Sequence, residues 1–312
     1  MGIGPGVLSL YAMMRRDGLL RSDIRIVELG SQVLVCHGNQ QAVVNLFAAF
    51  GVPQPEWWEL KTLAAGAPAR ALFERLGMDY SCIDASGEHG ALKWDLNFDV
   101  CAPEYRGQYQ LVTNHGTTEH VLNQFNSFKM VHDLAAKGGL VMHALPFLSY
   151  LDHGYFNYQP NLFIDLARTN GYELLGMWLN IDKNLTHLIP WERGLEKHLQ
   201  IEKSDSLLLV LFRKNLDAEF SVPFQAVYEH LVPESVLERY RYVVDGQAIS
   251  GKRGLILSIE ESLLRYHAMK GTTSSVHPDQ FFLKTITARS LFTELTRRVL
   301  KRLSMVFRGR LS

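Results

Sequence analysis

The chain has few cysteines and no excess of charge of either sign, and each absence narrows the range of functions. Only three cysteines, Cys36, Cys82 and Cys101, occur in 312 residues, and no two of them form a CxxC pair. So sparse a set argues against a disulfide framework or a structural zinc site and favours a reducing compartment. Lys and Arg number 32, as do Asp and Glu, so no overall basic field suggests a nucleic-acid partner.

A long hydrophobic run is also missing. The longest apolar candidate, Gly139 to Leu151, is interrupted by His143 and Pro146 and is shorter than the ~20 apolar residues that a membrane span requires. The apolar start, Met1 to Met14, has no basic leader charges, so we expect no secretory signal. The expected location is the cytoplasm.

Apolar runs alternate with amphipathic stretches through roughly the first 180 residues, as strands and helices do in an α/β domain. Three of the runs, IRIVEL, GLVMHA and SLLLVLF, are apolar almost throughout, which is typical of strands buried on both faces. We therefore predict a doubly wound, mostly parallel, seven-stranded sheet. The predicted strands are 24–29, 80–83, 91–94, 109–113, 139–144, 172–179 and 206–212, and the predicted helices are 39–50, 65–76, 118–135 and 161–169.

The pattern changes after Lys214, which predicts a sheet domain over 1–214 and a mainly helical C-terminal extension over 215–312. From Lys284 onward the extension reads as an amphipathic helix with eight basic residues and one acidic residue. Three interpretations remain open: the helix packs its apolar face on the domain, lies on an anionic membrane as a peripheral contact, or binds a polyanionic partner. Packing on the domain is the commonest outcome for such a helix.

Acidic and polar residues follow successive predicted strands, and these strand ends meet along one crevice of an open parallel sheet. A carboxylate after the second strand, Asp84, can accept hydrogen bonds from the hydroxyls of a ribose, and a further carboxylate can accept from an adenine amine. The turn after the first strand offers Gly30 alone where a dinucleotide fingerprint needs GxGxxG, and no P-loop occurs. The pattern therefore predicts an adenosine-containing ligand without phosphates.

Over about residues 24–214 the sequence resembles the class I, Rossmann-like, S-adenosylmethionine-dependent methyltransferases. The resemblance is carried by VELGS at 27–31, CIDAS at 82–86, LKWDLN at 92–97, LVTNHGTTEH at 111–120, and YELLGMWL followed by SLLLVLFRK. It implies S-adenosylmethionine as cofactor and an antiparallel last strand, with Asp84 at the ribose and Asp95 at the adenine amine. The implied cofactor residues are Glu28, Gly30, Ser31, Gln32, Asp84, Ala85, Asp95, Leu96, Asn114 and His115.

Two features depart from the family pattern. The first motif lacks the usual further glycines, and the stretch from Gly30 to Asp84 is longer than usual, which suggests an inserted helical cap.

Five histidines fall in or near the expected crevice, His132 among them, and the other four are the candidate catalytic residues: His115, His120, His143 and His153. A base with a pKa near neutral helps to methylate a hydroxyl, and histidine suits that role, although a structural role is commoner for any one of them. Glu119 is a plausible partner for His153. The i, i+5 spacing of His115 and His120 does not place them on one helical face, so we expect no metal site.

The sequence thus predicts methyl transfer from S-adenosylmethionine to a small-molecule or carbohydrate-like (glycan) acceptor, with oxygen as the favoured acceptor atom. The alternative is a non-catalytic nucleoside-binding or regulatory protein of the same fold. A nicotinamide-dependent oxidoreductase is disfavoured by the missing glycines.

Overall fold

The computed structural model describes residues 2–36, 38–181, 186–192, 195, 205–240, 242–244 and 247–249. The chain divides into two compact units, Met1–Glu192 with Ile201–Thr272, and Arg193–Gln200 with Thr273–Ser312. Every element discussed below belongs to the first unit. The amphipathic helix predicted from Lys284 onward lies outside the described residues. Within the described part of the chain, no helix has the length and apolar character needed to cross a bilayer.

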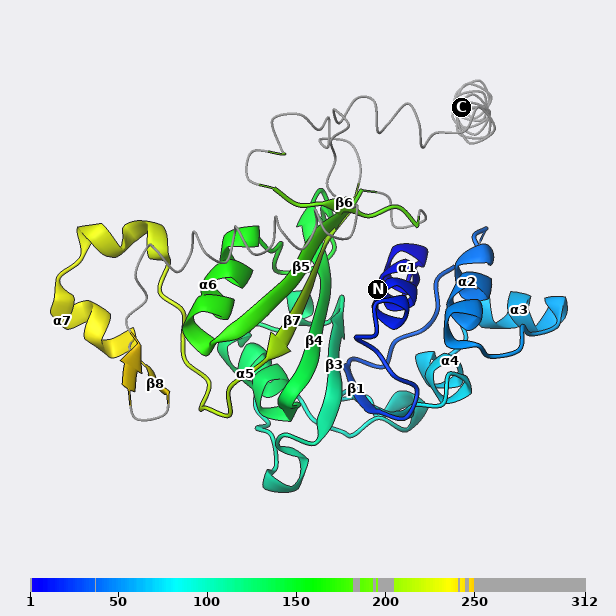
Figure 1. Cartoon of the computed structure of the whole chain (residues 1–312), viewed down its shortest axis with the longest axis horizontal. Helices are drawn as coiled ribbons and strands as arrows, with labels where there is room; N and C mark the ends of the chain where they lie inside the picture. The colour runs from blue at the N-terminus through cyan, green and yellow to red at the C-terminus, as the bar shows by residue number, and fades with distance from the viewer. Residues whose placement is uncertain are drawn as a thin grey trace, which may run out of the picture. The chain divides into compact units, whose positions relative to one another are not determined.

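Seven strands form one sheet in the order β2-β1-β3-β4-β7-β5-β6 (Figure 1). Strand β1 pairs in parallel with β2 and β3, β3 pairs in parallel with β4, and β7 runs antiparallel to both β4 and β5. The predicted doubly wound, mostly parallel sheet with an antiparallel last strand is therefore confirmed. The strands are β1 (Arg25–Leu29), β2 (Asp79–Ile83), β3 (Tyr109–His115), β4 (Ala135–Leu148), β5 (Tyr172–Asn180), β6 (Ile189–Pro190) and β7 (Ser206–Lys214).

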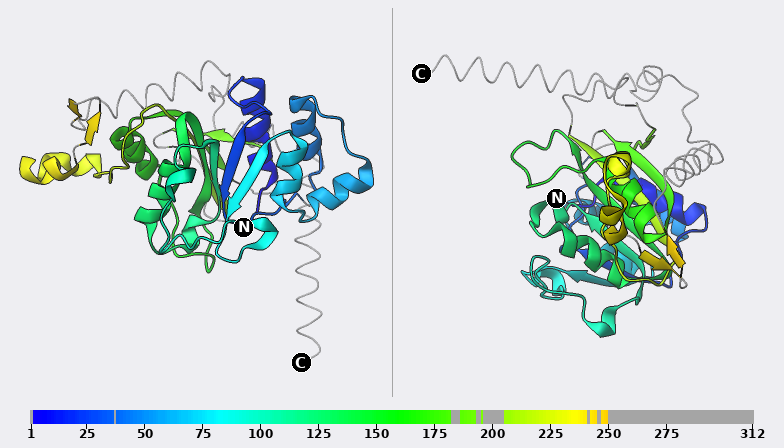
Figure 2. Two further views of the ribbon diagram at one scale, coloured as in Figure 1. Left: turned by 90° about the horizontal axis from the view of Figure 1, so that it is seen from below. Right: turned by 90° about the vertical axis from the view of Figure 1, so that its left-hand side faces the viewer.

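Helices cover both faces of the sheet (Figures 1 and 2). On one face lie α1 (Pro5–Arg16), α2 (Gln41–Phe50), α3 (Trp57–Ala64) and α4 (Ala69–Arg75), and on the other lie α5 (Gln124–Leu134) and α6 (Pro160–Asn170). Alternate residues of β4 point to opposite faces. Met142 joins the core beneath the first group, whereas the His143 ring packs against Phe128 of α5 and Phe163 of α6.

The third predicted strand, 91–94, is wrong. Only Leu92 pairs, through an isolated parallel bridge with Ile83, because the Trp94 amide donates to the Leu92 carbonyl and turns the chain away after one residue. The seventh strand of the sheet is instead the two-residue β6.

Two of the helical boundaries also differ from prediction. The helix expected over 118–135 begins only at Gln124, where the Asn123 side chain caps it by accepting from the Asn126 amide, and Thr118–His120 forms a separate 3-10 turn. The expected helix 65–76 is the shorter α4, and α1 and α3 were not predicted. Helices α2, α3 and α4 occupy the long stretch between Gly30 and Asp84, where an inserted helical cap is expected.

The chain beyond β7 first packs against α6. The buried Arg168 guanidinium pairs with Glu229 and donates to the Phe224 carbonyl, and Asn170 exchanges hydrogen bonds with the backbone of Ser221. The remaining elements are short: η6 (Ala226–Leu231), α7 (Glu234–Leu237), η7 (Glu238–Tyr240) and the hairpin of β8 (Tyr242–Val244) with β9 (Gln247–Ile249).

Candidate active site

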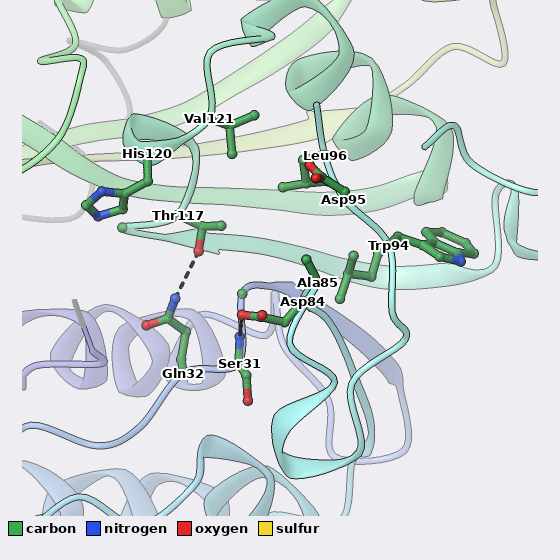
Figure 3. Close-up of a pocket in the computed structure, with 13 residues that line it drawn as sticks. Ser31, Gln32, Asp84, Ala85, Trp94, Asp95, Leu96, Thr117, His120 and Val121 are labelled. Atoms are coloured by element: carbon green, nitrogen blue, oxygen red, sulfur yellow. Dashed lines mark hydrogen bonds between the residues drawn. The ribbon is translucent and has the colours of Figure 1, made fainter. Parts of the chain in front are cut away.

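A pocket of about 330 Å³ opens at the C-terminal ends of β1, β2 and β3 (Figure 3). Strand β1 lies between β2 and β3, so the strand order of the sheet reverses direction at β1. In open α/β sheets, ligands bind at such a switch point. None of the thirteen lining residues is Lys or Arg, so the wall carries no cation for a phosphate. They are Gly30, Ser31, Gln32, Ile83, Asp84, Ala85, Trp94, Asp95, Leu96, Gly116, Thr117, His120 and Val121.

Asp84 stands at the end of β2 and is held by backbone donors. Its Oδ2 accepts from the Ser31 amide and its Oδ1 from the Ser86 amide, both at 2.9 Å. Burial alone would raise the pKa of Asp84, but the hydrogen bonds from Ser31 and Ser86, together with the nearby charge of His89, outweigh burial and hold the pKa below its usual value. The side chain is therefore an oriented carboxylate in the pocket wall.

Gly30 ends β1 in the left-handed region, with φ of 82°. A Cβ atom at this position would lie 2.3 Å from Thr117 Oγ1 and 2.7 Å from Gln32 Nε2. Those two groups form a hydrogen bond of 2.9 Å across the pocket (Figure 3). Thr117 Oγ1 also donates to the Leu29 carbonyl. Glycine is thus the residue that lets the β1 turn and the Thr117 turn approach each other.

The segment after the Leu92 bridge forms the opposite wall. Asp95 and Leu96 line the pocket, and Asp95 Oδ1 accepts from the Asn97 amide at 2.8 Å. Asn97 Oδ1 in turn accepts from the amides of Leu122 and Asn123, which ties this wall to the start of α5. Asp99, the other carboxylate of the segment, accepts from the Asp95 amide but does not line the pocket.

Four of the predicted site residues are buried and do not line the pocket: Glu28, Asn114, His115 and His143. Glu28 is fully buried, with Oε2 2.6 Å from the Tyr80 hydroxyl and Oε1 2.5 Å from His115 Nδ1. The far nitrogen of His115 lies 3.4 Å from the Tyr11 hydroxyl of α1. Helix α1 therefore covers this polar pair from one side of the sheet.

His143 lies inside β4, not at the strand end where the sequence places it, because β4 extends to Leu148 in its pairing with β7. Its Nδ1 accepts from the Asn114 side-chain amide at 3.2 Å, and burial lowers its pKa to about 3. A neutral ring among Phe128, Phe163 and Phe212 is a core side chain.

The other two predicted histidines meet beside the pocket around Glu119. His120 Nε2 lies 3.8 Å and His153 Nε2 3.6 Å from Glu119 Oε1, and the two imidazole ring centres are 4.9 Å apart. Glu119 is fully buried, which raises its pKa to about 7, and burial followed by the charge of His153 lowers the pKa of His120. Of the three residues, only His120 lines the pocket.

The structure thus brings eight of the predicted residues into one pocket wall: Gly30, Ser31, Gln32, Asp84, Ala85, Asp95, Leu96 and His120. The other five lining residues are not among the predicted site residues: Ile83, Trp94, Gly116, Thr117 and Val121. The first four lie inside the motifs CIDAS, LKWDLN and LVTNHGTTEH, and Val121 directly follows the last of these, so their place in or next to a motif is the signal that could have found them.

Neither a protein-family model nor a curated protein matches the sequence. Solved structures with a similar course of the chain include an S-adenosylmethionine-dependent methyltransferase from Mesorhizobium loti, at 12% identity over 65% of this chain and 97% of that one, with a TM-score of 0.30. Another is 1,6-didemethyltoxoflavin-N1-methyltransferase from Burkholderia thailandensis, solved with its substrate and S-adenosylhomocysteine, at 11% identity over 66% of this chain and 77% of that one, with a TM-score of 0.35.

Proposed function

We propose that this protein transfers a methyl group from S-adenosylmethionine to an oxygen atom of a small-molecule or carbohydrate-like acceptor. The observation that carries the proposal is the pocket at the switch point of the sheet, lined by Asp84 and Asp95 and by no Lys or Arg. Two carboxylates suit the ribose hydroxyls and the amine of an adenosine, and a wall without cations suits a ligand that carries a sulfonium and no phosphate.

The lining residues divide the task of holding the cofactor. A carboxylate has about four acceptor positions, and two of those on Asp84 are used by the Ser31 and Ser86 amides, which leaves two for a ribose diol. We assign Asp95 to the adenine amine because it lines the same pocket as Asp84. Gly30 and Gly116, both at positive φ, let the backbone approach the ligand closely.

When bound, S-adenosylmethionine would supply an electrophilic methyl group: the acceptor oxygen would bond to the methyl carbon as the carbon–sulfur bond breaks, sulfur would keep the electrons of that bond, and the hydroxyl proton would pass to a base. Glu119, His120 and His153 are the groups beside the pocket that can handle that proton. The Tyr155 ring, 73% exposed and anchored by its amide to the Glu119 carbonyl, offers a face on which a sugar or planar ring can stack. This cluster supports oxygen as the acceptor atom.

Calorimetric titration with S-adenosylmethionine and S-adenosylhomocysteine tests the cofactor. We expect both to bind, and Asp84→Asn to weaken binding by about 1–3 kcal/mol, roughly 5- to 150-fold in Kd, because charged hydrogen bonds are lost. Asp79→Asn is the matched control, since Asp79 begins the same strand at its opposite end with its side chain 69% exposed.

Equal binding by the wild type and Asp84→Asn would contradict the ribose assignment, and no binding of either compound would contradict the proposed function. Turnover is then measured as release of S-adenosylhomocysteine over a panel of hydroxyl-bearing acceptors and sugars. Tight binding without turnover on the whole panel would favour the non-catalytic alternative.

A further inference from the structure

Glu119, His120 and His153 form a cluster whose geometry resembles the ligand set of a metal ion. One ligand atom from each residue can be chosen so that all three lie within 4.8 Å of one another. Both imidazole Nε2 atoms approach the same carboxylate oxygen, at 3.8 Å and 3.6 Å. Bond lengths of about 2.0–2.1 Å place the ligand atoms around a tetrahedral ion roughly 3.4 Å apart, so small side-chain movements suffice to close the site.

The carboxylate at the centre of this cluster is buried without a hydrogen-bond donor among the described residues. Glu119 has a side-chain exposure of 0%, and among the described residues neither of its carboxylate oxygens accepts a hydrogen bond. The two imidazoles lie beyond hydrogen-bond distance of it. Buried carboxylates in folded proteins are hydrogen-bonded, paired or bound to a metal, because an isolated buried charge is costly.

Backbone contacts hold the loop of His153 against Glu119, although the two residues are far apart in the sequence. The Tyr155 amide donates to the Glu119 carbonyl at 2.7 Å. A Cβ atom on Gly154 would lie 2.9 Å from Glu119 Cγ, so glycine permits this approach. Tyr150 and Asp152 both adopt positive φ in the loop that carries His153.

We propose that Glu119, His120 and His153 bind one divalent transition-metal ion of the Zn²⁺ type. Two imidazoles and one carboxylate suit Zn²⁺ and its neighbours in the first transition row, whereas Mg²⁺ and Ca²⁺ prefer sites made of oxygen alone. Three protein ligands leave at least one coordination position open, and His120 belongs to the pocket wall. Binding of the ion stands on the cluster itself, while a role for it in receiving the oxygen of the acceptor rests on the proposed function.

The test uses untagged, full-length protein stripped with a chelator and then titrated with Zn²⁺ in the calorimeter and with Co²⁺ by visible absorption. We expect one ion per chain. Glu119→Gln and His153→Gln should each lower the affinity at least as much as the loss of an outer-shell partner does, roughly 10- to 100-fold. His230→Gln, which removes an exposed histidine from η6, is the matched control and should bind like the wild type.

Thermal unfolding of each metal-free variant verifies that it is folded, and His153→Gln, on a surface loop, keeps the test open if Glu119→Gln does not fold. Absence of stoichiometric binding, or binding that neither variant weakens, would overturn the metal site. S-adenosylmethionine is titrated in parallel into the same metal-free samples. If the metal binds but S-adenosylmethionine does not, the metal site stands and the proposed function is contradicted. If S-adenosylmethionine binds but the metal does not, the metal site is contradicted and the proposed function stands.

Discussion

At the scale of single residues, Gly30 affects both the backbone conformation after β1 and the packing of the pocket wall. We expect Gly30→Ala to lower the free energy of unfolding by about 1–2 kcal/mol through left-handed strain alone. A further loss follows because the new methyl group would lie 2.3 Å from Thr117 Oγ1 and displace the Thr117–Gln32 hydrogen bond. S-adenosylmethionine binding should weaken in the same variant, since that hydrogen bond spans the pocket.

Gly51→Ala separates the effect of left-handed backbone strain from that of the steric conflict with Thr117. Gly51 also has positive φ, 68°, but nothing lies within 4 Å of the position that its Cβ would take. Urea unfolding of both variants should therefore show the larger loss for Gly30→Ala, and calorimetry should show weakened cofactor binding for that variant only. Equal losses, or unchanged binding in Gly30→Ala, would mean that the close approach at Thr117 does not matter.

At the scale of secondary-structure elements, the end of β7 holds the end of α5. Lys214 is buried, and its ammonium group donates to the carbonyls of His132 and Ala135 at 2.8 and 3.1 Å. These carbonyls lie at the C-terminal end of the helix, where the backbone has no partners of its own and the helix dipole favours a cation.

We expect Lys214→Met to lower the free energy of unfolding by about 1–3 kcal/mol, because the side chain keeps its bulk while two buried carbonyls lose their donor. Lys137→Met, at an exposed position of β4, should change it by less than about 0.5 kcal/mol. The measurement is chemical denaturation of both variants beside the wild type. Equal free energies of unfolding for the two variants would show that water donates to the two carbonyls in place of Lys214.

The elements themselves were predictable where a long apolar run ends at a glycine or a polar residue. Strands β1, β4, β5 and β7 are of this kind. The failures have local physical causes: the run at 91–94 is diverted after one paired residue, and the Asn123 cap delays α5. Helix α1 is missed because the apolar start of the chain resembles a targeting segment and gives no separate helical signal.

In the candidate site, too, some residues could be predicted from the sequence and others could not. Residues next to strand ends, such as Asp84 and Asp95, could be predicted to share a pocket because parallel strands align their ends. The engagement of Glu28 by Tyr80 and His115 depends on the register of three strands, and one sequence does not reveal that register. The approach of His153 to Glu119 depends on the path of a loop with residues at positive φ, which apolar periodicity does not predict either.

At the scale of the whole molecule, we expect buried neutral histidines to make the stability of the fold depend on acid pH. His132 has both ring nitrogens engaged, with Nδ1 2.6 Å from the Tyr172 hydroxyl and Nε2 2.6 Å from the Ala218 carbonyl. Burial, then the nearby charge of Lys214, lowers its pKa to about 4, and the neighbouring Asp133 opposes that shift. The core residue His143 has its pKa lowered to about 3 by burial.

In the unfolded chain these histidines titrate near 6.5, so between that pH and the lowered value the unfolded state binds more protons than the folded state. Stability contributed by His132 is therefore complete above about pH 6.5 and is lost as the pH falls toward 4. From pH 7 to pH 5 the expected loss is about 2 kcal/mol for this residue. Asp165, whose pKa burial raises to about 6, acts in the opposite direction, so the contribution of His132 has to be isolated by substitution.

Urea unfolding at pH 7 and pH 5 gives that contribution as a difference between proteins. The fall in the free energy of unfolding between the two pH values should be about 2 kcal/mol smaller in His132→Gln than in the wild type, even though the variant is less stable at both. His230→Gln, on the exposed side of η6, should reproduce the wild-type fall. A fall that is the same in all three proteins would mean that His132 is not kept neutral by the fold, and that the hydrogen bonds around it persist with a charged ring.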